Sequence, residues 1–181
     1  MIPKVLSEPP LVVDTDFLSS FAWVNRLDIL ERLFPAQMVL LEEVQIEISK
    51  VPHLAKQVEN CIANGTILLT TMTADSPEAI DLAKYLEDGK YGRGEAACMA
   101  YLKYNPGTMG SNNLADVEQF CRDNNKRILC TGHCLYRALT LKIVTSGECE
   151  YLWQKMISKR RKLPTATFKE FTSKFIPTST P

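Results

Sequence analysis

Leu11-Val12-Val13-Asp14-Thr15-Asp16 is the stretch that decides the fold, because three apolar residues end abruptly on two aspartates. A short apolar run behind Pro9-Pro10 is typical of a buried strand. The Asp14 carboxylate would then lie at the carboxyl end of that strand, where parallel sheets bind their ligands. The alternative is that Asp14, Thr15 or Asp16 caps the helix that follows. For Asp16 we expect a capping or supporting role rather than a ligand.

Strands and helices alternate along the rest of the chain. We expect strands at residues 11–13, 38–41, 66–71, 108–111 and 127–131. We expect helices at residues 17–34, interrupted near Asn25, and at 42–49, 53–64, 77–86, 95–103, 114–122, 134–141 and 149–159. This alternation predicts an α/β fold with a central parallel sheet and helices on both faces.

Length and composition favour one globular domain. The chain has 181 residues, of which 45% are hydrophobic and 23% charged, and both fractions are ordinary for a globular protein. We expect the folded domain at residues 1–164 and a C-terminal extension at 165–181. Phe168, Phe171 and Phe175 would dock part of this extension, and its last residues would fray. Because the formal net charge is zero, nucleic-acid binding would require a local basic patch.

The cysteines and the apolar segments bear on the compartment. Six cysteines occur at irregular spacing without a C-x-x-C motif, so we expect buried thiols in a reducing environment. The N-terminus lacks the apolar region of a signal peptide, and no run is long enough to cross a membrane. We therefore expect a cytoplasmic protein with no membrane association.

Further acids stand in settings similar to that of Asp14. Glu47 lies in a helical pattern after an apolar strand, Glu95 opens Gly94-Glu95-Ala96-Ala97, and Asp116 follows Asn112-Asn113. Carboxylates that a fold gathers together form sites for hard divalent cations. Each acid also has a structural alternative: a solvated helix face for Glu47, a favoured first-turn acid for Glu95 and a capping box for Asp116. The set predicts a metal site better than any of its members does.

Several short motifs occur in a fixed order along the chain. They are residues 11–18, residues 38–48, Gly92-Arg-Gly-Glu-Ala-Ala97, residues 127–133 and Lys162-Leu163-Pro164. On these motifs the chain resembles PIN-domain nucleases, the group that includes VapC-type toxins. The resemblance covers most of residues 11–170. It implies a PIN-like three-layer α/β/α fold and a ribonuclease that depends on Mg²⁺ or Mn²⁺.

The resemblance also implies roles for individual residues. The family's acids fall on Asp14, Glu47 and Glu95, but its fourth acid belongs to an Asp-Asp pair where this chain has Asn112-Asn113. Asp116 is the expected substitute. We expect Asp14, Glu95 and Asp116 to bind the metal, with Glu47 as a further ligand or a residue that orients water. Substrate contacts are expected from Thr15, Lys90, Arg93, Asn112 and Asn113.

Other motifs carry less information. Lys159-Arg160-Arg161-Lys162 is the densest basic run, which we interpret as a solvated helix end, with phosphate contact as the alternative. A zinc site at Cys130, His133 and Cys134 would lack a fourth ligand. The sequence contains no P-loop, no G-x-G-x-x-G and no G-x-S-x-G motif.

Two hypotheses for function follow. The first is a metal-dependent ribonuclease, for which the resemblance implies a role as the toxin of a toxin–antitoxin or defence system. Its partners would be RNA and an antitoxin or other regulatory protein, and the resemblance leaves room for a homodimer. The second hypothesis is prompted by Asn112-Asn113. It is a catalytically weak or inactive PIN-fold module that binds a partner protein or RNA.

Overall fold

β1 (Leu11–Val13) is the central strand of a five-stranded sheet in the computed structural model, which describes residues 8–176. The strand order is β3-β2-β1-β4-β5, and every neighbouring pair is parallel. The other strands are β2 (Met38–Leu41), β3 (Ile67–Thr70), β4 (Thr108–Gly110) and β5 (Arg127–Leu129). In the register of the sheet, Val12 lies opposite Val39 on one side and Met109 on the other.

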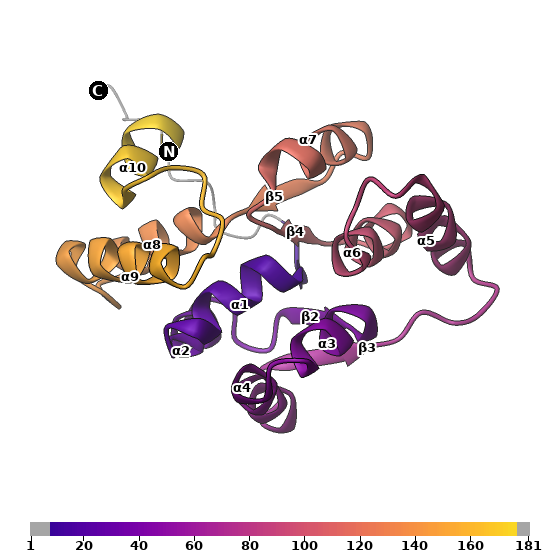
Figure 1. Cartoon of the computed structure of the whole chain (residues 1–181), viewed down its shortest axis with the longest axis horizontal. Helices are drawn as coiled ribbons and strands as arrows, with labels where there is room; N and C mark the ends of the chain where they lie inside the picture. Colours follow the sequence, from indigo (N-terminus) through magenta and orange to yellow (C-terminus); the bar gives the residue numbers. More distant parts are fainter. Residues whose placement is uncertain (1–7, 177–181) are drawn as a thin grey trace.

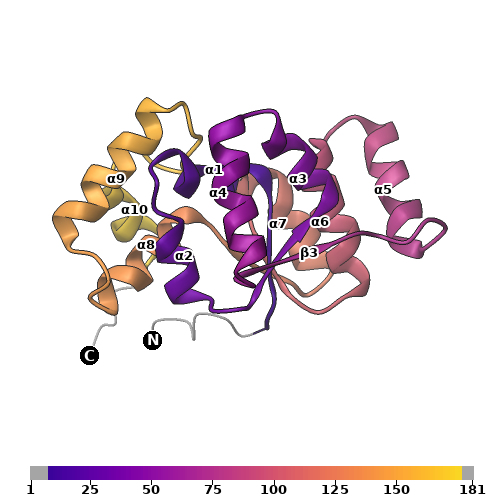
Figure 2. The same cartoon turned by 90° about the horizontal axis from the view of Figure 1, so that it is seen from below.

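Helices cover both faces of the sheet, which confirms the α/β class and agrees with a three-layer α/β/α arrangement. Figure 1 shows α1, α2 and α8–α10 on one side, with α5 and α6 on the other. Seen from below, α5 and the group α8–α10 lie at opposite ends of the molecule (Figure 2). The helices of residues 8–176 are α1 (Thr15–Trp23), α2 (Leu27–Leu33), α3 (Glu42–Ser49), α4 (Pro52–Ala63), α5 (Pro77–Asp88), α6 (Arg93–Tyr104), α7 (Leu114–Asp123), α8 (Thr131–Thr140), α9 (Ser146–Ser158) and α10 (Phe168–Phe175).

The strand order creates a switch point beside β1. The chain leaves β1 for β2 on one side, whereas β4 pairs with the other edge of β1. In sheets of this kind, ligands bind in the crevice outside the carboxyl ends of the strands at such a point. Asp14 follows β1 directly, and Ser111 follows β4 directly. The fold therefore brings these two segments together where a binding site is expected.

Helix boundaries differ from the predicted ones where capping decides them. Asn25 adopts a positive φ of 55° and separates α1 from α2, as the interruption near that residue predicted. α9 begins at Ser146 rather than at residue 149, because Thr145 and Glu148 form a capping box. α8 begins at Thr131 rather than at residue 134, so β5 is shorter than expected.

The C-terminal segment packs on the domain through its aromatic residues. Phe168 and Phe171 of α10 are buried, and the Phe171 ring centre lies 5.5 Å from that of Trp153. Gly132 of α8 allows this packing, because a Cβ at that position would lie 2.5 Å from the Phe171 ring. The predicted fraying concerns residues 177–181, which lie outside the described residues.

The cysteines and the membrane prediction can also be compared with the structure. All six cysteines are buried free thiols, as expected from their spacing. No helix within residues 8–176 has both the length and the apolar character needed to span a membrane.

Candidate functional site

A hollow of about 260 Å³ opens at the carboxyl edge of the sheet, beside β1 and β4. Three of its residues follow β1, two belong to the beginning of α6, and the others come from α3, from the loop after β4 and from the segment after α9. The lining residues are Asp14, Thr15, Asp16, Glu47, Gly92, Glu95, Asn113 and Lys162. The fold thus brings together residues that are up to about 150 positions apart in the chain.

Asp14 is the most deeply buried acid of the hollow, with 3% of its surface exposed. Its Oδ1 accepts a hydrogen bond of 2.7 Å from the Phe17 amide, so Asp14 caps α1. Burial raises the pKa of Asp14 to about 7, against the lowering effect of hydrogen bonds from Ser111 and Phe17. From the sequence, Asp14 was expected either to cap the following helix or to bind a ligand. The structure shows the capping role.

Glu95 faces the same hollow from the first turn of α6. Desolvation raises the pKa of Glu95 to about 7, and the negative charges of Asp116 and Asp16 act in the same direction. The Asn113 amide partly opposes this effect by donating a hydrogen bond of 3.0 Å to Glu95 Oε1. Two carboxyls with raised pKa values therefore lie at one site, which is typical of functional sites.

Glu47 connects α3 to both sides of the hollow. Its Oε2 accepts a hydrogen bond from the Thr15 hydroxyl, and its Oε1 accepts one of 3.0 Å from the Gly94 amide. A Cβ at position 94 would lie 2.7 Å from Thr15 Oγ1 and 2.9 Å from Glu47 Oε2, so only glycine fits this close approach. Both Glu47 oxygens are thus engaged in holding α6 against α1 and α3.

The two asparagines after β4 have different surroundings. Asn113 precedes α7, and its amide bridges two acids by donating to Glu95 and, at 2.7 Å, to Asp116 Oδ2. Asn112 is buried and donates to Ser20 Oγ at 3.2 Å, while its oxygen accepts from the Thr131 amide at 2.9 Å. Asn113 therefore takes part in the site, whereas Asn112 joins α1 to α8 beneath it.

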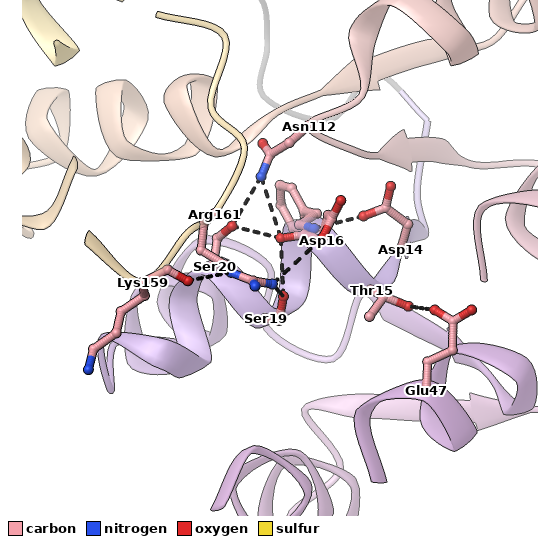
Figure 3. A network of polar contacts seen from close by, with 10 residues as sticks. Asp14, Thr15, Asp16, Ser19, Ser20, Glu47, Asn112, Lys159 and Arg161 are labelled. Carbon is pink, nitrogen blue, oxygen red and sulfur yellow. Dashed lines mark hydrogen bonds and ion pairs between the residues drawn. The ribbon is translucent and has the colours of Figure 1, made fainter. Parts of the chain in front are cut away.

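Arg161 attaches the segment after α9 to α1. Figure 3 shows its guanidinium directed at Ser19 and Asp16, with Nη1 3.1 Å from Ser19 Oγ and 3.7 Å from Asp16 Oδ1. Its Nε also donates to the Lys159 carbonyl at 3.2 Å. Since Lys162 follows directly and lines the hollow, this part of the basic run is docked against the site. The expectation of a solvated helix end is therefore wrong for Arg161, whereas Lys162 is exposed and also lines the hollow.

Comparison with known proteins was made at the level of families, curated sequences and solved structures. None of the three gives a match to this chain. The resemblance of the short motifs thus stays a prediction, and the function has to be argued from the geometry of the hollow.

The donor set limits what kind of metal ion the hollow could hold. Among residues 8–176, no group of three or more His, Cys, Asp or Glu side chains is placed to bind one ion. Mg²⁺ needs fewer protein ligands, because it is usually held by one or two carboxylates together with waters and substrate phosphates. Asp14 and Glu95 line one hollow and offer only oxygen donors. They fit a hydrated Mg²⁺ or Mn²⁺ and do not form an all-protein cage.

The structure brings some predicted site residues together and not others. Asp14, Thr15, Glu47, Glu95 and Asn113 line the hollow, whereas Asp116 reaches it only through Asn113. The exposed Lys90 and Arg93 are not among the lining residues, although the charge of Lys90 lowers the pKa of Glu95. Their substrate contacts, like that of Asn112, stay predictions.

Three lining residues were not selected as site residues from the sequence, namely Asp16, Gly92 and Lys162, and two of them are charged. The signal for Asp16 was its position two residues after Asp14. The signal for Lys162 was its place at the end of the densest basic run. For these two charged residues the commoner structural role, a helix cap or a solvated helix end, was preferred.

Proposed function

We propose that this protein is a ribonuclease that hydrolyses phosphodiester bonds with the help of one Mg²⁺ or Mn²⁺ held by Asp14 and Glu95. The observation that carries the proposal is that both carboxyls line one hollow and have pKa values raised to about 7. Buried carboxyls are costly to ionise, and a divalent cation removes that cost. RNA as the substrate is supported by the motif resemblance alone.

The chain's own residues would divide the work as follows. Glu47 holds the beginning of α6 through Gly94 and Thr15, which keeps Glu95 on the side of the hollow facing Asp14. Lys162 adds a positive charge for the phosphate, and Asp16 at the rim can accept a proton from the attacking water. When bound, the cation supplies Lewis-acid activation of the phosphoryl group. Glu47 is thus a positioning residue in this account.

Cleavage of RNA tests the proposal. Purified protein would be incubated with single-stranded RNA and Mn²⁺, alongside Asp14→Asn and Glu95→Gln, which keep the shape of each side chain. We expect cleavage by the wild type and a loss of at least about 100-fold in each variant, the range seen when a key electrostatic group is removed. Equal cleavage by all three proteins would exclude catalysis at this hollow.

A second function is favoured by the loop after β4. Asn112 and Asn113 stand where the resemblance implies acids, and within the described part of the chain no three acidic, His or Cys side chains are placed to bind one ion. A PIN-like module that binds RNA or a protein without cleaving it would tolerate this. Association with an antitoxin or another regulatory partner rests on the resemblance alone.

A further inference from the structure

The basic run after α9 forms a docked strip that leads into the hollow. The strip is defined here as residues 159–162, Lys-Arg-Arg-Lys. Residues 151–169 contain six of the chain's 21 lysines and arginines and no acid, although the formal net charge of the chain is zero. Positive charge is therefore denser in this segment than in the rest of the chain.

The strip is held in place by Arg161 and Trp23. The side chain of Arg161 is 22% exposed and contacts Ser19 and Asp16 of α1. Its guanidinium carbon lies 5.9 Å from the Trp23 ring centre, and the Lys159 ammonium lies 5.8 Å from it. These are cation–π distances, and they fix two cations of the strip against the end of α1.

Three of the four cations of the strip remain exposed, including Lys159, whose ammonium lies over the Trp23 ring. Lys159, Arg160 and Lys162 are exposed, and Lys162 lines the hollow that contains Asp14 and Glu95. Arg160 adopts a positive φ of 58° where α9 ends, a conformation in which glycine is usual. This turn leads the chain from the end of α9 to the rim of the hollow. Figure 3 shows the Lys159 ammonium pointing away from the polar network around Arg161.

We infer that the strip, fixed by Trp23, is the binding surface for the phosphates of single-stranded RNA next to the scissile bond. This inference takes its substrate class from the proposed function. Lysine and arginine at surface positions bind successive phosphates without regard to base sequence. Lys162 would hold the phosphate nearest the carboxylates, and Arg160 and Lys159 would hold its neighbours along the strand.

RNA binding without cleavage tests the inference. The affinity of the full chain for fluorescent single-stranded RNA would be measured in EDTA over a range of KCl concentrations. The test variant is Lys159→Gln/Lys162→Gln, whose two lysines are exposed, so the fold should be kept. The matched control is Lys142→Gln/Lys174→Gln, which removes the same charge from two exposed lysines outside the strip.

The expected result is specific to the strip. The test variant should bind at least about tenfold more weakly at low salt, on oligo(U) and oligo(A) alike. The slope of log K against log [KCl] should fall by about 1.4, which is 0.7 for each of two phosphate contacts on a single strand. The control should bind like the wild type. Equal weakening in both variants, no weakening in either, or no RNA binding by the wild type would overturn the inference.

The outcome separates this inference from the proposed function. Suppose that the test variant binds RNA normally, that the wild type cleaves RNA and that Asp14→Asn does not. The proposed nuclease activity is then supported, and the inference about the strip is overturned. If the strip binds RNA and no cleavage occurs with Mn²⁺, the inference about the strip is supported, and the protein is a binding module rather than a nuclease. Binding of the strip to anionic lipid vesicles without any binding of RNA would also overturn the inference.

Discussion

Glu47 accepts a hydrogen bond from the hydroxyl of Thr15, which lies 32 positions earlier in the chain. The same carboxylate accepts the Gly94 amide, 47 positions later. One side chain therefore joins α1, α3 and α6 at the edge of the hollow. An acid that resembles a metal ligand in the sequence holds together the helices that carry the other acids.

Gly94→Ala tests this close approach. The added Cβ would lie 2.7 Å from Thr15 Oγ1 and 2.9 Å from Glu47 Oε2, and overpacking of this kind typically costs about 1–3 kcal/mol. We expect a loss of stability in this range, measured by urea denaturation. Gly92→Ala is the control, because a Cβ there would meet nothing within 4 Å. Equal stability of the two variants would contradict the role given to Glu47 and Gly94.

The raised pKa values predict how stability depends on pH without divalent cations. The pKa values of Asp14 and Glu95 rise from 3.8 and 4.5 to about 7, so the folded protein binds more protons than the unfolded chain between these limits. Their contribution is fully present below pH 4 and is lost as the pH rises through about 7. Thermal denaturation in EDTA should show this loss, and Asp14→Asn should reduce it.

Asp81 has the opposite effect on the pH profile. Hydrogen bonds from Lys103, Lys84 and Tyr104 lower the pKa of Asp81 below its ordinary value of 3.8. Its contribution is present above that value and is lost as the pH falls further. Between pH 4 and pH 8, His133 acts in the same direction as Asp81, because burial lowers the pKa of His133 below its ordinary value of 6.5. The contribution of Asp14 is therefore taken from the difference in stability between the wild type and Asp14→Asn. A difference between wild type and Asp14→Asn that does not fall as the pH rises through about 7 would contradict the prediction.

Asn113→Asp tests the altered position after β4. The new carboxylate would lie beside Glu95 and Asp116, to which the Asn113 amide now donates. Without metal, we expect lower stability at neutral pH, because like charges repel. With Mn²⁺, we expect a larger rise in the melting temperature than in the wild type, because tighter binding stabilises the folded state by mass action.

Asn112→Asp is the matched control for that experiment. Asn112 is buried and uses its amide for Ser20, so the change should destabilise the protein without strengthening Mn²⁺ binding. An equal gain in Mn²⁺ affinity from both variants would show that charge near the loop, rather than the place of Asn113, decides the effect.

Phe171→Ala tests the docking of α10. Its ring packs against Trp153 and Phe168 and fills the space over Gly132, so its removal should cost about 3–5 kcal/mol in urea denaturation. Phe175→Ala should cost less, since Phe175 is only partly buried. If Phe171→Ala is as stable as the wild type, α10 is not part of the folded domain.

The class of the fold could be predicted from local pattern, whereas its details could not. Alternating apolar strands and amphipathic helices are properties of short segments. The bounds predicted for the strands at residues 11–13 and 38–41 are therefore the same as those of β1 and β2. The order of the strands depends on pairings between distant segments. The start of α9 was missed although Thr145-x-x-Glu148 is a capping-box pattern, because the apolar periodicity begins only at Cys149.

The site was predictable as a set of acids at one edge of the sheet and not as a geometry. Asp14 and Glu95 follow from their places after a strand and at a helix start. That Asn113 bridges Glu95 and Asp116, or that Arg161 contacts Ser19 across 142 positions, depends on tertiary packing. For Asp16 and Lys162 the sequence offered a common structural role, and only the hollow distinguishes them from ordinary surface charges.

The most direct test of the central proposal is a crystal structure of the protein soaked with Mn²⁺, with anomalous scattering used to locate the ion. We predict one ion in the hollow, bound by Asp14 and Glu95 at about 2.0–2.3 Å and otherwise by water, with Glu47 still bonded to Thr15 and Gly94. No ion in the hollow at saturating Mn²⁺, or an ion bound without Asp14 and Glu95, would contradict the account.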